Sequence, residues 1–295
     1  MKLCLGTVQF GIKYGIASQG QPDFADSVQI METAFVNGVT AFDTSASYGN
    51  AEVILGEFIK NNSKVRSQFE IATKLPHKCF TDVPKEKYFD ICAKHLSESL
   101  KRLNCDYADY ILLHTSSDVF DGRIREAMYK LVSAGLTRKA GASIYSPDEA
   151  MTAAASAEME CIQIPYNAVD RRLDKAGFFA VAGGKTVFCR SVLLQGLLTM
   201  DSDKLPANLQ IARPYIEQYE ALCKKYGVSK VELGVSYIAA KKGIDYLIIG
   251  VDNEAQLFEQ IKLMKKPIKP QALAEIQNMF GDVPEYVLNP GLWNK

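Results

Sequence analysis

Eight short apolar runs alternate with longer amphipathic stretches from one end of this sequence to the other. The stretches with helical character cover residues 26–37, 51–60, 85–103, 122–133, 147–156, 171–181, 213–226, 230–242 and 254–264. We expect the apolar runs to form strands at residues 3–7, 41–43, 69–74, 110–114, 140–143, 161–165, 186–190 and 246–250. Strands that alternate with helices form a parallel sheet. Eight repeats of this unit favour a closed (β/α)8 barrel (TIM barrel), an α/β fold, over an open doubly wound sheet.

The chain of 295 residues has about the length of one such barrel with additions. Length alone also allows two domains of about 150 residues, but no Pro/Gly/Ser-rich linker or low-complexity segment divides the sequence. An open dinucleotide-binding sheet requires GxGxxG after the first strand, where this sequence has GTVQFG. We therefore predict one domain over residues 1–295, with an irregular tail at 281–295 placed to lie across one mouth of the barrel.

The charge and cysteine content argue against several classes of protein. Lys+Arg and Asp+Glu both number 34, so the net charge is zero, and no basic block indicates nucleic-acid or membrane binding. No run of about 18 apolar residues occurs, and the first apolar run is too short for a signal peptide. Seven scattered cysteines without a CxxC, and three histidines, favour reduced thiols over disulfides or a metal site. These features predict a cytoplasmic protein that holds no metal and binds neither nucleic acid nor a membrane.

Three titratable residues end successive predicted strands. Asp43 ends the second, Lys74 the third and His114 the fourth, and Tyr48 follows Asp43 by five residues. Each has an ordinary explanation when taken singly, as a turn former, a solvent-facing lysine, a structural histidine, or one of 14 tyrosines. The carboxyl ends of barrel strands carry the chemistry of such folds. The occurrence of these four residues together at the ends of adjacent strands therefore predicts an active site.

These four residues suit the reduction of a carbonyl group. Hydride addition places negative charge on the carbonyl oxygen, so an acid must deliver a proton, and we assign that role to Tyr48. Tyrosine has a reference pKa of about 10, which we expect the ammonium of Lys74 to lower. Asp43 is expected to pair with Lys74, and His114 to hydrogen-bond the substrate oxygen.

The segment FDTSASYGNAE at residues 42–52 resembles the D-T-A-x-x-Y-G-x-S-E signature of the aldo/keto reductases. Thr73-Lys74-Leu75 and Leu112-Leu113-His114 match that family's strand-three lysine and strand-four histidine, and the resemblance runs from Gly6 to about Gln260. It implies a (β/α)8 barrel, a nicotinamide cofactor extended across the mouth, and reversible carbonyl reduction.

The resemblance also implies a set of cofactor contacts, with two departures. Ile144 stands where the family has an asparagine, and Arg190 stands where many members stack an aromatic ring on the nicotinamide. A flat guanidinium can also stack on a ring; the alternatives are that Arg190 pairs with a barrel carboxylate or reaches the pyrophosphate. The implied contacts are Thr7, Asp43, Ser143, Gln163, Arg190, Ser191, Leu193, Gln195, Gly196, Gly250, Asp252, Gln256 and Gln260.

NADP(H) is the default cofactor of the family, but NAD(H) is more credible here than for a typical member. No basic residue lies between 250 and 256, and Asp252 would repel a 2′-phosphate. The sequences of residues 190–196 and 165–172 resemble those of a bacterial subgroup associated with surface-polysaccharide or nucleotide-sugar metabolism. This resemblance points to a sugar-derived carbonyl substrate. The expected partner is a small-molecule carbonyl compound, and the expected state is a monomer or weak homo-oligomer. The alternative function is a cofactor-binding regulatory or sensor subunit with little turnover.

Overall fold

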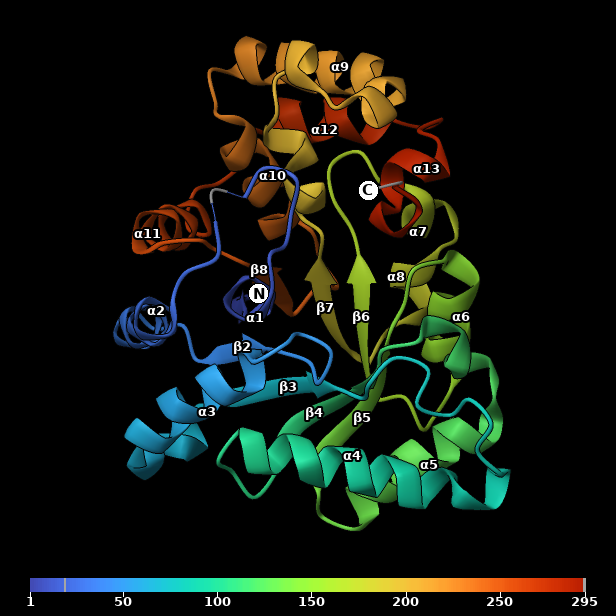
Figure 1. Ribbon diagram of the computed structural model, residues 1–295. Coiled ribbons are helices and arrows are strands. Elements are labelled where there is room, and N and C mark those ends of the chain that lie inside the picture. Colours follow the sequence, from blue (N-terminus) through green and yellow to red (C-terminus); the bar gives the residue numbers. More distant parts are fainter. Residues whose placement is uncertain (19, 294–295) are drawn as a thin grey trace.

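Eight parallel strands close into a barrel in the order of the sequence (Figure 1). The computed structural model describes residues 1–18 and 20–293. The fold prediction is confirmed, and each expected strand coincides with an observed one. The strands are β1 Lys2–Gly6, β2 Ala41–Asp43, β3 Glu70–Lys74, β4 Ala108–Leu113, β5 Thr137–Ser143, β6 Cys161–Pro165, β7 Thr186–Arg190 and β8 Tyr246–Ile249.

Helices surround the barrel, and side chains cap several of them. Asp23 accepts the Asp26 amide before α2, and Ser146 forms a capping box with Glu149 before α6. Gly227 ends α9 in the left-handed conformation, at φ 66°. The helices are α1 Val8–Gly11, α2 Phe24–Val36, α3 Ala51–Asn61, α4 Tyr88–Arg102, α5 Gly122–Ser133, α6 Pro147–Ala155, α7 Arg172–Lys175, α8 Phe178–Val181, α9 Arg213–Tyr226, α10 Lys230–Ala239, α11 Glu254–Leu263, α12 Pro270–Asn278 and α13 Glu285–Leu288.

Several regions differ from the sequence prediction, and α1 and α12 lie outside all of the expected helices. The helix expected at residues 171–181 is two short helices, because Gly177 between α7 and α8 has φ 73° and breaks the helical path. The tail expected to be irregular contains α13, preceded by Pro284, and the indole of Trp293 donates to the Tyr286 carbonyl. The Tyr215 hydroxyl donates to the Asp282 carbonyl, so the tail lies against α9.

An apolar layer fills the interior of the barrel. The rings of Phe188 and Tyr246 stack at 4.4 Å, and Tyr110 packs edge-on against Phe188. Small side chains on other strands leave room for these rings, as close packing requires. The members of the layer are Cys4, Ala41, Ala72, Tyr110, Leu112, Cys161, Phe188, Tyr246 and Ile248.

A second layer lies toward the carboxyl ends of the strands. Side chains alternate between the two faces of a strand, so the residue two positions after an inward one also points inward. On each strand, the residue two positions after a member of the apolar layer therefore points into the barrel, and most of these residues belong to the predicted site. The positions so reached, with Ser143 two residues after the inward Gly141, are Gly6, Asp43, Lys74, His114, Ser143, Gln163, Arg190 and Gly250.

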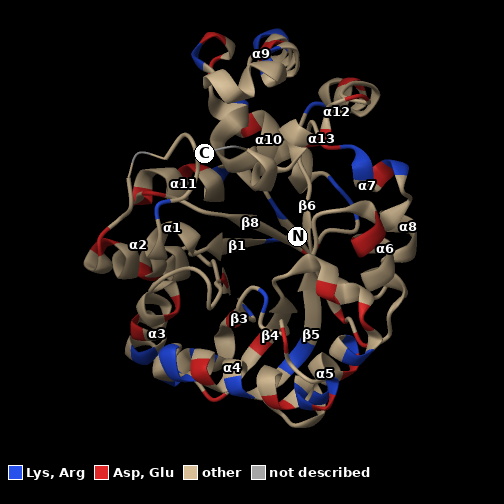
Figure 2. Ribbon diagram, turned by 45° about the vertical axis from the view of Figure 1, so that its right-hand side comes forward, with Lys and Arg blue, Asp and Glu red and all other residues tan. Residues whose placement is uncertain are grey.

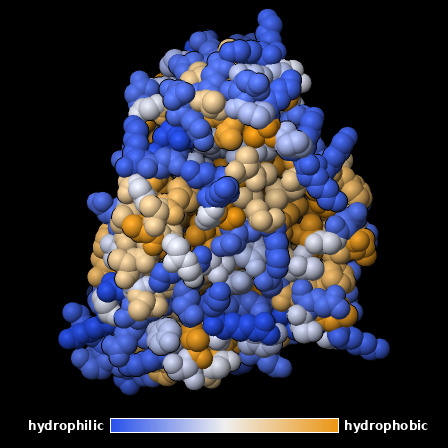
Figure 3. Space-filling view, turned by 180° about the vertical axis from the view of Figure 1, so that it is seen from behind, coloured by the Kyte–Doolittle hydropathy of each residue, from blue (hydrophilic) through white to orange (hydrophobic). Residues whose placement is uncertain are grey.

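The outer surface mixes charges and broken apolar patches. Lysines, arginines, aspartates and glutamates are interspersed on the outer helices, for example on α4 and α5 (Figure 2). Seen from behind, apolar patches are divided by hydrophilic side chains (Figure 3). Within residues 1–18 and 20–293, no helix is long and apolar enough to span a membrane, and no group of three acidic, histidine or cysteine side chains could hold a metal ion.

We predict that Gly141→Ala destabilises the barrel. A Cβ at this position would lie 2.0 Å from the Cys161 carbonyl oxygen and 2.4 Å from its Sγ, so β5 and β6 would have to separate. Overpacking of this kind costs about 1–3 kcal/mol of unfolding free energy, which chemical denaturation measures. Gly183→Ala is the control, because a Cβ there meets nothing within 4 Å. Equal stability of the two variants would show that the barrel interior yields at this point.

Candidate active site

A buried ion pair joins β2 to β3 at the mouth of the barrel. The Lys74 ammonium donates to both carboxylate oxygens of Asp43 and to the Thr44 carbonyl, each at 2.8 Å. An ammonium has three protons, so these contacts use all of them. The Lys74 side chain is fully buried and that of Asp43 nearly so. Removal of either partner would leave an unpaired charge inside the barrel.

Three of the predicted cofactor contacts support this pair. The Gln163 amide donates to Asp43 Oδ1 at 2.7 Å, and the Ser143 hydroxyl donates to Gln163 Oε1 at 3.1 Å. The Thr7 hydroxyl donates to the Asp43 backbone carbonyl at 3.1 Å. All three residues are buried. Their observed partners are therefore protein groups that hold Asp43 in place.

Tyr48 brings a phenol to the ion pair. It follows β2 on the loop at residues 44–50, and its ring centroid lies 4.8 Å from Lys74 Nζ. The His114 ring meets it edge-on, with centroids 5.5 Å apart. The structure thus brings Asp43, Tyr48, Lys74 and His114 together, although Asp43 and Lys74 end β2 and β3, His114 follows β4 and Tyr48 lies on a loop.

The pKa of Tyr48 does not follow the sequence prediction. We expected Lys74 to lower it; instead burial raises this pKa, the Asp43 carboxylate raises it further, and Arg190 partly opposes both. Lys74 directs its protons to Asp43 and Thr44 rather than to the phenol. Tyr48 therefore keeps its proton at neutral pH and is a neutral donor in the free protein.

His114 is held uncharged. Burial lowers its pKa to about 2, and the nearby charges of Lys74 and Arg190 act in the same direction. Its Nδ1 lies 2.9 Å from the Ser45 hydroxyl, and its ring stacks on that of His77 at 3.7 Å. Sequence reasoning missed both neighbours, because neither Ser45 nor His77 ends a strand.

A cleft of about 340 Å³, here named the mouth cleft, opens beside Tyr48 and runs along the ends of β7, β8 and the start of α11. Tyr14, Gln9 and Glu259 also line it, and no strand-end motif marked these residues. Tyr14 lies on the loop after α1, and burial raises its pKa to about 12. The predicted contacts that line the cleft are Asp43, Arg190, Ser191, Leu193, Gln195, Gly196, Gly250, Asp252, Gln256 and Gln260.

The loop after β7 has a strained backbone. Ser191, Leu194 and Gln195 have φ between 50° and 60°, which is uncommon outside glycine, and Gly196 has φ 95°. The Gln195 carbonyl accepts the Ile16 amide at 2.9 Å, so this loop is tied to the loop after α1. Strain of this kind concentrates at ligand sites.

Unpartnered polar atoms also point to a ligand in the mouth cleft. The amide oxygens of Gln9, Gln195 and Gln260 are buried and have no hydrogen-bond partner in the described structure. Buried polar groups are nearly always hydrogen-bonded, so exceptions require an explanation. A long polar ligand along the cleft would provide partners for all three.

Arg190 makes contacts that narrow its role. Its guanidinium lies 4.3 Å from the Tyr145 ring centroid and donates to the Ile144 carbonyl at 2.8 Å and to the Ser191 hydroxyl at 3.2 Å. Among the described residues it forms no ion pair with a carboxylate, so that alternative is wrong. Arg190 leaves a positive charge at the Tyr48 end of the mouth cleft.

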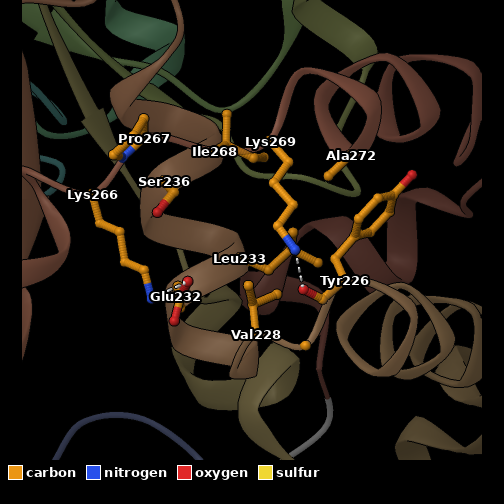
Figure 4. Close-up of a pocket in the computed structure, with 11 residues that line it drawn as sticks. Tyr226, Val228, Glu232, Leu233, Ser236, Lys266, Pro267, Ile268, Lys269 and Ala272 are labelled. Carbon is orange, nitrogen blue, oxygen red and sulfur yellow. Dashed lines mark hydrogen bonds and ion pairs between the residues drawn. The ribbon is translucent and has the colours of Figure 1, made fainter.

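A second hollow, of about 230 Å³, lies between α9, α10 and the start of α12 (Figure 4). Lys266 pairs with Glu232 at 2.7 Å, and the Lys269 ammonium donates to the Tyr226 carbonyl at 2.9 Å. None of the four predicted catalytic residues lines it. Asp43 and Tyr48 line the mouth cleft, and Lys74 and His114 lie behind them in contact with these two residues, so the mouth cleft is the candidate active site.

Comparison with known proteins agrees with this geometry. The sequence profile of the aldo/keto reductase family matches residues 2–280. The chain belongs to the aldo/keto reductase family. It is therefore related to oxidoreductases that reduce carbonyl compounds.

Individual relatives are distant. The aldo-keto reductase YhdN of Bacillus subtilis is 28% identical over 264 residues, which cover 81% of this chain and 78% of that protein. The NADH-specific methylglyoxal reductase of Escherichia coli is 25% identical and covers 88% of each chain. The holo form of aldo-keto reductase AKR11C1 from Bacillus halodurans superposes with a TM-score of 0.74 at 21% identity, over 94% of this chain and 91% of that one. This structural likeness shows the shared barrel fold.

We predict that His114 makes the protein less stable in acid. The unfolded chain binds a proton at this side chain near pH 6.5, whereas the folded protein does so only near pH 2. Stability is therefore present above pH 6.5 and is lost as the pH falls. Between pH 7 and pH 5 the wild type should lose about 2 kcal/mol more unfolding free energy than His114→Gln.

Urea unfolding of both proteins across this pH range measures the difference. The variant starts from a lower stability, so the slopes and not the absolute values are compared. Parallel curves would mean that His114 titrates alike in the folded and unfolded states.

Proposed function

We propose that this protein reduces an aldehyde or ketone to an alcohol by hydride transfer from a reduced nicotinamide cofactor, with Tyr48 as the proton donor. The observation that carries the proposal is the phenol of Tyr48 beside the buried Lys74–Asp43 pair, with neutral His114 at its edge. The reduced nicotinamide, when bound, supplies the hydride to the carbonyl carbon. This chain's residues supply the proton and orient the carbonyl oxygen.

Each residue has a role that follows from its charge state. Tyr48 carries a proton at neutral pH and delivers it to the carbonyl oxygen as negative charge develops there. The phenolate left behind lies close to the ammonium of Lys74, and Arg190 adds a second positive charge. Asp43 keeps Lys74 charged and in place, since an unpaired buried ammonium would tend to lose its proton.

The mouth cleft fits an elongated dinucleotide. Gly196 and Gly250 lie on its wall, and their missing Cβ atoms let two other wall residues pack against the backbone: a Cβ would stand 2.6 Å from Ala17 Cβ and 1.9 Å from Gln9 Oε1, respectively. The amides of Gln9, Gln195 and Gln260 would find partners on the cofactor. Ser143 and Gln163 do not line the cleft, but they are linked by hydrogen bonds to Asp43, which does, and the family resemblance assigns them to the nicotinamide carboxamide.

The charges at the far end of the cleft favour NAD(H). Asp252 and Glu259 line the cleft there, and Arg190 is the only lysine or arginine among the described residues that line it. The 2′-phosphate of NADP(H) would therefore meet carboxylates on the wall of the cleft. We propose that NAD(H) binds at least as well as NADP(H), although NADP(H) is the family default.

The proposed substrate class is aldehydes and ketones, and a panel of carbonyl compounds would identify the substrate. Initial rates with NADH and with NADPH should be measured over methylglyoxal, simple aldehydes and ketones, aldo- and keto-sugars, and nucleotide sugars. A sugar-derived carbonyl is the class that the sequence resemblance favours. Turnover of any of these compounds at ordinary enzymatic rates would exclude the alternative of a regulatory or sensor subunit.

We predict that Tyr48→Phe abolishes most of the activity. Loss of the general acid should lower kcat by about 10²–10⁴, while cofactor binding, followed by fluorescence titration, is retained. Tyr129→Phe is the matched control, because Tyr129 lies on α5 and is 43% exposed. This variant should have the kcat of the wild type. Activity of Tyr48→Phe close to that of the control would remove Tyr48 from the mechanism.

We also predict that Glu259→Lys improves NADPH binding. The substitution replaces a carboxylate of the mouth cleft with an ammonium, so the dissociation constant for NADPH should fall by about tenfold, with little change for NADH. Glu126→Lys makes the same charge change on α5, where Glu126 pairs with Lys130, and should leave both constants unchanged. Equal gains for NADH and NADPH would argue against a carboxylate that repels the 2′-phosphate.

A further inference from the structure

Ser45 occupies a position that the family signature gives to alanine. The signature reads D-T-A, whereas this chain has Asp43-Thr44-Ser45. The side chain of Ser45 is completely buried. Its hydroxyl lies 2.9 Å from Nδ1 of His114. The hydroxyl places a hydrogen-bonding group beside His114, where an alanine side chain would offer none.

Two groups lie within hydrogen-bond distance of Ser45 Oγ in the described structure. The backbone amide of Ser47 donates to Ser45 Oγ at 3.0 Å. The hydroxyl then has one proton of its own to give. Among the described residues, His114 Nδ1 is the one acceptor in hydrogen-bond reach of it. The Ser45 proton therefore goes to Nδ1, because a buried hydroxyl proton without a partner is unfavourable.

The hydrogen bond donated by the Ser45 hydroxyl determines the tautomer of His114. A neutral imidazole carries its proton on one nitrogen, and a nitrogen that accepts a hydrogen bond is the one without it. The opposite tautomer would have Nδ1 donate to Ser45, which leaves the hydroxyl proton of Ser45 unpaired. It would also direct a lone pair from Nε2 toward a bound carbonyl oxygen, which repels it.

We propose that Ser45 is a positioning residue that fixes His114 as the Nε2–H tautomer, so that His114 donates a hydrogen bond to the substrate carbonyl. The role of His114 as donor rests on the proposed function, whereas the tautomer itself does not. Ser45 acts through His114: neither residue lines the mouth cleft, but the His114 ring lies edge-on to Tyr48, which does.

The other neighbours of His114 keep it available for this role. Lys74 and Arg190 are the cations that disfavour its protonation, as does its neighbour His77. The rings of His77 and Tyr48 restrict the His114 ring from its face and its edge. These contacts hold the ring plane but do not distinguish the two nitrogens. The Ser45 hydroxyl is what distinguishes them.

The tautomer can be observed directly by NMR. The chain has three histidines, so protein labelled with ¹⁵N-histidine gives a simple spectrum of long-range ¹⁵N–¹H correlations. The His114 signals are assigned by their absence in His114→Gln. We expect the Nε2–H pattern between pH 6 and 8 in the wild type. An Nδ1–H pattern, or a protonated imidazole in this range, would overturn the proposal.

Two substitutions test whether Ser45 is the cause. Ser45→Ala should shift the His114 pattern toward exchange between both tautomers, and Ser45→Thr, which retains a hydroxyl, should restore the wild-type pattern. Ser47→Ala is the matched control: its hydroxyl accepts the His77 amide at 3.4 Å, and its backbone amide still reaches Ser45. An unchanged Nε2–H pattern in folded Ser45→Ala would overturn the proposal.

Kinetics separate this proposal from the proposed function. With the best carbonyl compound of the panel, Ser45→Ala should lose roughly tenfold in kcat and keep the wild-type dissociation constant for NADH, as for other groups that orient a functional histidine. If Tyr48→Phe retained full activity, the proposed function would fail, yet the NMR tautomer would be unaffected. If the NMR test failed while Tyr48→Phe was inactive, the error would lie in Ser45 alone.

Discussion

The rest of the site depends on the buried pair of Lys74 and Asp43. An ion in the barrel interior loses its hydration, and this loss is offset only when the partner geometry and the remaining hydrogen bonds are good. Here all three ammonium protons have acceptors, and Gln163 gives the carboxylate a further donor. The pair is neutral as a whole, so Tyr48 can pack against it as an uncharged phenol. Proton transfer from Tyr48 would change this balance, because the phenolate would face a cation already in place.

The barrel supports this pair through the two-residue period of its strands. Ala41 and Ala72 lie in the apolar layer, and Asp43 and Lys74 follow two residues later on the same inward face. The stacked rings of Phe188 and Tyr246 fill the same apolar layer as Ala41 and Ala72. On β1 and β8 the residues at the corresponding positions are Gly6 and Gly250. Neither has a side chain, and both line the mouth cleft. One geometric rule thus sets both the polar cluster and the open space beside it.

The sequence was sufficient for the strands and for the four clustered residues, because both depend on local pattern and on the rule that strands end at one mouth. It was not sufficient for charge states, which depend on packing. Lys74 was expected to lower the pKa of Tyr48, but the pKa is set by burial and by Asp43, whose distance to the phenol no motif reveals. Tyr14 was missed because it lies on an irregular loop, and the break at Gly177 because an amphipathic pattern can continue across a left-handed residue. Ser143 and Gln163 were named by resemblance as cofactor contacts, but the sequence did not reveal that Gln163 donates to Asp43 or that Ser143 donates to Gln163.

The charges along the mouth cleft change sign from one end to the other. Arg190 stands near Tyr48, and Asp252 and Glu259 stand beyond the loop after β7. A positive charge at the first end favours any step in which oxygen becomes negative, and it lowers the pKa of Tyr48 that burial and Asp43 raise. Carboxylates at the second end disfavour an additional phosphate there. Arg190 is held by the Ile144 carbonyl and the Tyr145 ring, and no carboxylate of the described residues pairs with it, so within that part of the chain its charge is not cancelled. Among the described lining residues, the polarity of the cleft therefore follows from the Arg190 guanidinium at one end and two acids at the other, and under the proposed function it would act on the cofactor and on the reacting carbonyl at once.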